Sequence, residues 1–251
     1  MSKEIEYCLL VLPRADVHKL SKRAKKQFLM LTNVLRDMDL FRKLMIYVKE
    51  QNLNDERLSG VAFVTLAFSI TKLLMSKLYE AWKFLGKEQV VSEVGTFSEG
   101  LRAQWSAVES VCGTSQNAEL FGFVRNKFGF HFDSYEEIES VIEEAMNEVG
   151  DLEFWMPTEQ SWNDLFASSN TVMLVVLRTK MMELGFVGTE EELIGQLIRL
   201  SVDASYALNE FCKGYLTEVV LKGLSFQEVS RIVASVPVLS EVNLPLVVVK
   251  D

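Results

Sequence analysis

Three residues near the middle of the chain carry side chains that together suit the cleavage of a phosphodiester. Arg125, Asn126 and His131 lie within the segment 120–133, with five residues between Arg125 and His131. A neutral His takes a proton from a ribose 2′-hydroxyl because its ordinary pKa lies near ~6.5. An Arg stays charged and presents a planar fork of donors, so it would stabilise the extra charge on a pentacoordinate phosphorane. We therefore expect catalytic roles for Arg125 and His131, with Asn126 orienting the imidazole or holding a phosphate.

The local chain is expected to bring these residues together. Apolar residues at helical spacing before Arg125 predict a helix that ends near Phe128. A chain that turns back there would bring the imidazole of His131 within reach of the Arg125 guanidinium. Gly122 and Gly129 permit close packing or a kink at this point.

Other kinds of catalytic or cofactor site lack support in the sequence. Walker A, dinucleotide-binding, zinc-protease and serine-hydrolase motifs do not occur. The chain has 3 scattered Cys without a C-x-x-C pair and only 2 His, which argues against a disulfide framework, a zinc ribbon and a His-rich metal centre. We expect no metal and no cofactor, and we expect Cys112 to be structural rather than a nucleophile.

Composition and periodicity favour an all-α fold. The 251 residues include only 13 Gly and 4 Pro, few for an all-β chain, which needs many turn residues. Apolar residues recur at helical spacing, which predicts helices over 15–49 (as one helix or two), 56–85, 98–111, 119–127 and 134–149. The helix over 56–85 is apolar nearly all round in its first half, so it should lie at the centre of a bundle.

The last hundred residues continue this pattern. Helices are predicted to begin near Thr158 and to cover 171–184, 189 to about 215, and 225–235. The stretch 242–249 is apolar and extended, and we expect it to pack on its own bundle or on a partner subunit. We expect a helical bundle over residues 1–151 and a helical C-terminal extension over 152–251, packed on the same core.

Charge is unevenly distributed along the chain. The net charge of −9 argues against non-specific nucleic-acid binding, yet residues 14–26 are strongly basic. Residues 132–165 carry eleven acids and no Lys or Arg. One interpretation is that both runs are solvated helix faces. The other is that the basic run approaches phosphates while the acidic run faces a partner, such as a basic antitoxin or an adjacent subunit.

Two further features have a structural and a functional interpretation. Tyr79, Trp82 and Phe84 could stack a nucleobase or pack in the core. His18 lies in the basic run, where we expect an exposed polar residue. No apolar run is long and uninterrupted enough for a signal peptide or a membrane span, so we expect a cytoplasmic protein without a membrane partner.

The segment around Arg125 resembles the signature of the HEPN superfamily, all-α domains that occur widely in prokaryotic toxin and defence systems. That signature is an Arg, a few residues and then a His, with a polar residue such as Asn directly after the Arg. Arg125-Asn126 followed by His131 matches both parts, and the match lies at a helix end. In members paired with nucleotidyltransferase antitoxins a Tyr often stands two residues after the His, where this chain has Asp133.

The resemblance implies a bundle of HEPN type and a metal-independent endoribonuclease of a toxin–antitoxin or phage-defence system. It implies an RNA substrate, a homodimer in which two motifs meet in one cleft, and an antitoxin or another partner protein. The first alternative is a non-catalytic protein-interaction module of the same fold that works through its acidic face. The second is a helical ligand-binding or regulatory protein unrelated to HEPN.

Overall fold

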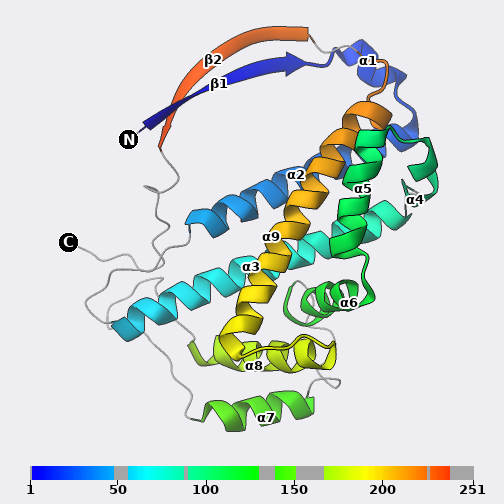
Figure 1. Cartoon of the computed structure of the whole chain (residues 1–251). Helices are drawn as coiled ribbons and strands as arrows, with labels where there is room; N and C mark the ends of the chain where they lie inside the picture. The colour runs from blue at the N-terminus through cyan, green and yellow to red at the C-terminus, as the bar shows by residue number, and fades with distance from the viewer. Residues whose placement is uncertain are drawn as a thin grey trace.

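The chain folds as an all-α bundle with one two-stranded ribbon, which confirms the predicted fold class (Figure 1). The structure, a computed structural model, describes residues 2–47, 56–87, 90–129, 139–150, 167–224 and 227–237. The elements in chain order are β1 Ser2–Val11, α1 Arg14–Lys19, α2 Lys22–Tyr47, α3 Glu56–Lys87, α4 Val90–Glu93, η1 Val94–Thr96, α5 Glu99–Cys112, α6 Ser115–Val124, η2 Arg125–Gly129, α7 Glu139–Val149, α8 Ala167–Glu183, α9 Glu190–Tyr215, η4 Leu216–Val220 and β2 Gln227–Pro237.

Helix α3 is the central element, as predicted. It contacts α2, α6, α8 and α9, and its C-terminal half is fully buried along one face through Leu74, Leu78 and Leu85. Phe63 and Val64 near its N-terminus are 38% and 41% exposed, so the apolar first half is only partly covered. The stretch Ser59–Gly86 is long and apolar enough to cross a membrane by length and composition alone, and half of its most apolar window is buried in the bundle.

Local sequence signals explain several helix ends. Ser98 accepts a hydrogen bond from the Leu101 amide and starts α5, as predicted. Thr189 and Glu192 form a capping box at the start of α9. Gly150 and Gly185 have φ of 74° and 89°, a backbone conformation that other residues adopt at a cost, and they follow α7 and α8. Helix α6 starts at Ser115, earlier than the predicted Glu119, because Thr114 caps it.

The last described element corrects one prediction. Residues 225–235 were expected to form a helix, but Gln227–Pro237 is strand β2, which pairs antiparallel with β1 from Ser2↔Pro237 to Val11↔Gln227. Among the described residues of the C-terminal extension, α8, α9 and η4 are helical and the last element is the strand β2. Figure 1 shows the two strands as a curved ribbon at the edge of the bundle, next to α1.

Helices from both halves of the chain share one core. Phe211 and Tyr215 of α9 pack against Phe97 with ring centroids 6.1 and 5.8 Å apart, and Trp105 of α5 lies 4.9 Å from Phe211. The predicted boundary at residues 151 and 152, the helix expected from Thr158 and the apolar stretch 242–249 all lie outside the described residues. The division into two regions stays a prediction.

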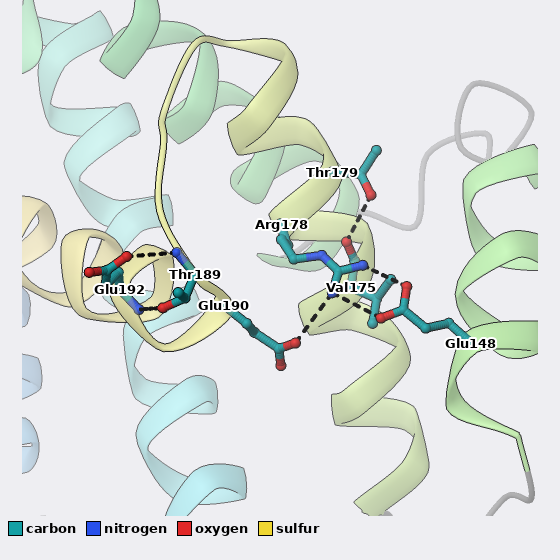
Figure 2. A network of polar contacts seen from close by, with 7 residues as sticks. All are labelled: Glu148, Val175, Arg178, Thr179, Thr189, Glu190 and Glu192. Carbon is teal, nitrogen blue, oxygen red and sulfur yellow. Dashed lines mark hydrogen bonds and ion pairs between the residues drawn. The ribbon is translucent and has the colours of Figure 1, made fainter.

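An arginine in α8 ties the last three long helices together (Figure 2). The two terminal nitrogens of Arg178 donate to both carboxylate oxygens of Glu148 in α7, at 2.9 and 2.6 Å. The same guanidinium donates to Glu190 at the start of α9 at 3.3 Å. These contacts fix α7, α8 and α9 relative to one another.

Candidate active site around Arg125

Arg125 begins a π-helical turn, η2, that directly follows α6. Leu120, Phe121 and Val124 are fully buried, so α6 is anchored in the core up to the residue before Arg125. The Arg125 amide donates to the carbonyls of both Phe121 and Gly122, a shared hydrogen bond that is common at helix ends, and the π-helical turn follows. Such turns frequently occur at functional sites because they re-aim side chains at the end of a rigid helix.

The Arg125 side chain is held at the surface by two neighbours. Its Nε donates to Glu80 Oε1 in α3 at 2.7 Å, and its Nη1 donates to Asn126 Oδ1 at 3.0 Å. The Arg125 side chain is 24% exposed and that of Glu80 is 48% exposed, so the ion pair lies at the solvent boundary. Nη2 has no hydrogen-bond partner among the residues that the structure describes. The two described contacts orient the guanidinium at the solvent boundary.

Two cavities lie on either side of the Arg125–Asn126 pair. The first, which we call the Tyr79 cavity, lies between α3, α6, η2 and α8 and has a volume of about 460 Å³. Its lining includes Tyr79, Lys83, Gly122, Asn126, Lys127 and Lys180. The second, which we call the Met30 cavity, lies between α2, α3 and η2 and has a volume of about 730 Å³. Its lining includes Met30, Arg36, Asp37, Lys77, Glu80 and Arg125. Lys83 lines both cavities. Arg125 and Asn126 therefore join two neighbouring hollows of one surface.

These cavities are cationic although the protein is acidic. Their walls carry six basic residues and three acidic residues, namely Arg36, Lys77, Lys83, Arg125, Lys127 and Lys180 against Asp37, Glu80 and Glu119. The whole chain has 26 basic and 35 acidic residues. The surface around Arg125 thus has the charge that favours a polyanion, in contrast to the chain as a whole.

The predicted site residues have different outcomes. Arg125 and Asn126 lie together at the edge of a solvent-accessible surface, as the catalytic hypothesis requires. His131 lies outside the described residues, so its position relative to Arg125 stays a prediction. The described carboxylate partner of Arg125 is Glu80 in α3, and most of the acidic run 132–165 lies outside the described residues.

The structure also describes the other residues that the sequence analysis selected, namely the aromatic cluster and His18. Tyr79 and Trp82 line the Tyr79 cavity and Phe84 lines the Met30 cavity, and all three are partly buried. Trp82 also stacks on Trp105, with centroids 5.7 Å apart, so it serves the core as well as the cavity wall. His18 is exposed, as predicted, and accepts a hydrogen bond from Arg14 Nε at 3.3 Å.

In both charged runs, some of the described side chains form ion pairs with other helices. In the basic run, Arg23 pairs with Glu93 at 2.6 Å, and Glu93 in turn accepts a hydrogen bond from Tyr215. Burial, together with the Glu93 contact, raises the pKa of Tyr215 to about 12, so this hydroxyl stays protonated and structural. In the described part of the acidic run, the acids of α7 are exposed, and Glu148 binds Arg178.

Cysteine and metal chemistry receive no support from the described residues. Burial raises the pKa of Cys112 to about 12, so its thiol is protonated at neutral pH, and Cys212 is equally buried. Within the described ranges, no three His, Cys, Asp or Glu residues gather as a set that could hold a metal ion.

Most charged residues that line the two cavities were not predicted from the sequence. Glu80, Lys83 and Lys180 come from α3 and α8, distant in sequence from Arg125, and carry no local signal that distinguishes them from solvated surface residues. Lys127 belongs to the motif segment and lines the Tyr79 cavity, but it is only 7% exposed. Comparison with protein-family models, curated proteins and solved structures finds no match for this chain.

Proposed function

We propose that this protein is a metal-independent endoribonuclease that cleaves RNA by attack of a ribose 2′-hydroxyl. The observation that carries the proposal is the oriented, part-exposed Arg125 guanidinium between two cation-lined cavities of an otherwise acidic protein. An RNA strand carries one charge per phosphate, so a surface of this kind is where it would bind.

The residues have distinct roles in this reaction. His131 removes the proton from the 2′-hydroxyl as a general base, while Arg125 binds the non-bridging phosphate oxygens and stabilises the negative charge that builds up on them. Asn126 and Glu80 act as positioning residues because both bind the guanidinium of Arg125. The bond from phosphorus to the 5′-oxygen of the next nucleotide breaks, which leaves a 2′,3′-cyclic phosphate and a 5′-hydroxyl.

The biological setting rests on the resemblance of the Arg125–His131 segment to the HEPN signature. It comprises a homodimer in which two motifs share a cleft, a role in a toxin–antitoxin or phage-defence system, and an antitoxin or another partner protein. A homodimer would also supply a second His for protonation of the leaving 5′-oxygen, since each chain has only one His in the motif.

The test is cleavage of a single-stranded RNA by the purified full chain in excess EDTA. We expect cleavage with a 2′,3′-cyclic phosphate end, no cleavage of the all-2′-deoxy strand, and a rate lower by roughly 10²–10⁴-fold in His131→Ala. The matched control is His18→Ala, because His18 is the other His of the chain and lies exposed in α1.

Three results would contradict the proposal. Cleavage that EDTA abolishes would point to a metal enzyme, and equal rates for His131→Ala and His18→Ala would remove the motif from the mechanism. If the pure protein cleaves no RNA but forms a stable complex with a protein partner, the non-catalytic interaction module becomes the function.

A further inference from the structure

The Tyr79 cavity has an aromatic wall beside its cations. Tyr79 and Phe123 both line it, and Phe123 is held edge-on by Phe128 with centroids 5.5 Å apart. A Cβ on Gly122 would lie 3.1 Å from Tyr79 Cε2, so the tyrosine ring takes this position because residue 122 has no side chain. The Lys83 and Lys180 ammonium groups lie 5.4 and 5.8 Å from the centroids of Tyr79 and Phe123, so the cavity wall pairs each aromatic ring with a cation.

The cations of this cavity differ in how firmly they are already bound. Lys180 pairs with Glu119 at 2.8 Å and with Glu183 at 3.5 Å, so much of its charge is neutralised. Lys83 is exposed, its Nζ lies 5.4 Å from the centroid of Tyr79, and it forms no ion pair with any residue that the structure describes. Lys83 is therefore more available to an incoming anion than Lys180 is.

The position of the cavity links it to Arg125. Asn126, which lines the Tyr79 cavity, accepts the Nη1 hydrogen bond of Arg125, which lines the neighbouring cavity. Lys83 lines both. A ligand that spans the two hollows would pass from the aromatic wall to the guanidinium along these three side chains.

We propose that the Tyr79 cavity binds one nucleotide of the RNA, next to the phosphate that Arg125 holds. The base lies against the wall of Tyr79 and Phe123, and the phosphate of that nucleotide is bound by Lys83. Stacking on an aromatic wall accepts any base, so the site contributes affinity with little sequence preference. A volume of about 460 Å³ lies within the roughly 300–1,000 Å³ range of small-molecule sites. This inference rests on the proposed endoribonuclease function.

Binding of a strand that cannot be cleaved tests the site separately from the reaction. We would measure the fluorescence anisotropy of a labelled, fully 2′-O-methylated oligonucleotide with the full-length protein over a range of salt concentrations. Tyr79→Leu, which removes the ring, should weaken binding by roughly 5- to 150-fold. Tyr79→Phe keeps the ring and should bind like the wild type. Lys83→Gln should lower the magnitude of the slope of log K against log[salt] by about 0.7, the value for one phosphate contact to a single strand.

Matched controls lie on another part of the surface. Tyr206 in α9 is 49% exposed and, like Tyr79, has a cation over its ring, with Arg42 Cζ at 4.6 Å from the centroid. Tyr206→Leu should leave the affinity unchanged. Lys213→Gln should leave the salt slope unchanged, because Lys213 lies on α9 away from both cavities and is 59% exposed.

The outcomes separate this inference from the proposed function. If Tyr79→Leu and Lys83→Gln bind like the two controls, or if the wild type binds no oligonucleotide, the nucleotide site is wrong. If free AMP competes as strongly as the oligonucleotide does, the cavity serves a mononucleotide and the RNA assignment is wrong. If the variants lose binding but the wild type cleaves no RNA, the site stands and the endoribonuclease proposal fails.

Discussion

Arg125 and Arg178 are matched in exposure and differ in what surrounds them. Each side chain is 24% exposed and each pairs with a glutamate that is about half exposed, Glu80 at 48% and Glu148 at 47%. Arg178 uses both terminal nitrogens on Glu148 and also binds Glu190 (Figure 2). Arg125 meets one carboxylate through Nε and the neutral Asn126 through Nη1.

The two guanidinium groups differ in how far neighbouring carboxylates neutralise their positive charge. Two carboxylates face Arg178, so a third anion would meet net negative charge there, and its contacts with Glu148 raise the pKa of Arg178 further. Among the described residues, one carboxylate pairs with Arg125, and the cavities around it add further Lys and Arg residues. Equal exposure therefore does not mean an equal environment: Arg178 ties helices together, while the described contacts of Arg125 orient its guanidinium and leave it next to fewer carboxylates.

Among conservative substitutions, Arg125→Lys should have the largest effect, and this effect is on the rate of RNA cleavage. An ammonium keeps the charge but lacks the planar fork that binds two phosphate oxygens, so kcat should fall by roughly 10²-fold. Steady-state kinetics on a single-stranded RNA would measure this. The control is Arg199→Lys, because Arg199 is exposed on α9 and its hydrogen bond within the described part of the chain goes to the Gly195 carbonyl of its own helix. A kcat close to that of the wild type would mean that Arg125 acts as a point charge only.

The two glutamates should separate positioning from stability. Glu80→Ala should lower kcat by roughly 10-fold or more without raising KM, because the guanidinium loses its orientation while the site loses a negative charge. Glu148→Ala should leave both constants unchanged and lower the melting temperature, since α7 loses its ion pair with α8. If Glu80→Ala raised KM alone, Glu80 would not position a group that acts in the transition state.

The acid stability of the Arg178 network gives a smaller effect with a defined sign. Hydrogen bonds from Arg178 hold the pKa of Glu148 below its ordinary value of 4.5. Because the folded state binds this proton less readily than the unfolded state, the contribution to stability is present above about pH 4.5 and is lost as pH falls through the lowered pKa. Below pH 4.5 the melting temperature of the wild type should therefore fall more steeply than that of Glu148→Gln. Parallel curves would show that the network adds no pH-dependent stability.

The sequence predicted those parts of the fold that local signals specify. The predicted helix ends at residues 98, 149, 184 and 189 agree with the structure to within a residue, because Ser98 and Thr189 cap α5 and α9 and glycines follow α7 and α8. The error at β2 has a clear physical cause. Val229, Ile232, Val233 and Val236 repeat at helical spacing, so the pattern predicted a helix. Their actual state depends on pairing with β1, more than 200 residues earlier in the chain, and no local pattern reports such a partner.

The same limit applies to the candidate site. Arg125 and Asn126 could be selected from the sequence because they are adjacent and belong to one motif. Glu80 lies 45 residues before Arg125, and the cations of the Tyr79 cavity come from three separate elements. Their proximity is a product of helix packing, so the charge of the site, cationic on an acidic chain, could not be read from composition or from charge runs.

The most direct test of the account compares Arg125→Ala with Arg178→Ala under one set of conditions. Cleavage of single-stranded RNA in EDTA would be measured per folded molecule, alongside the melting temperature of each variant. Arg125→Ala should lose roughly 10²–10³-fold in rate with a melting temperature within about 2 °C of the wild type. Arg178→Ala should melt lower by a few degrees and cleave at the wild-type rate while folded. Wild-type cleavage by Arg125→Ala, or equal losses of rate in both variants, would contradict the distinction between a guanidinium that binds substrate and one that binds helices.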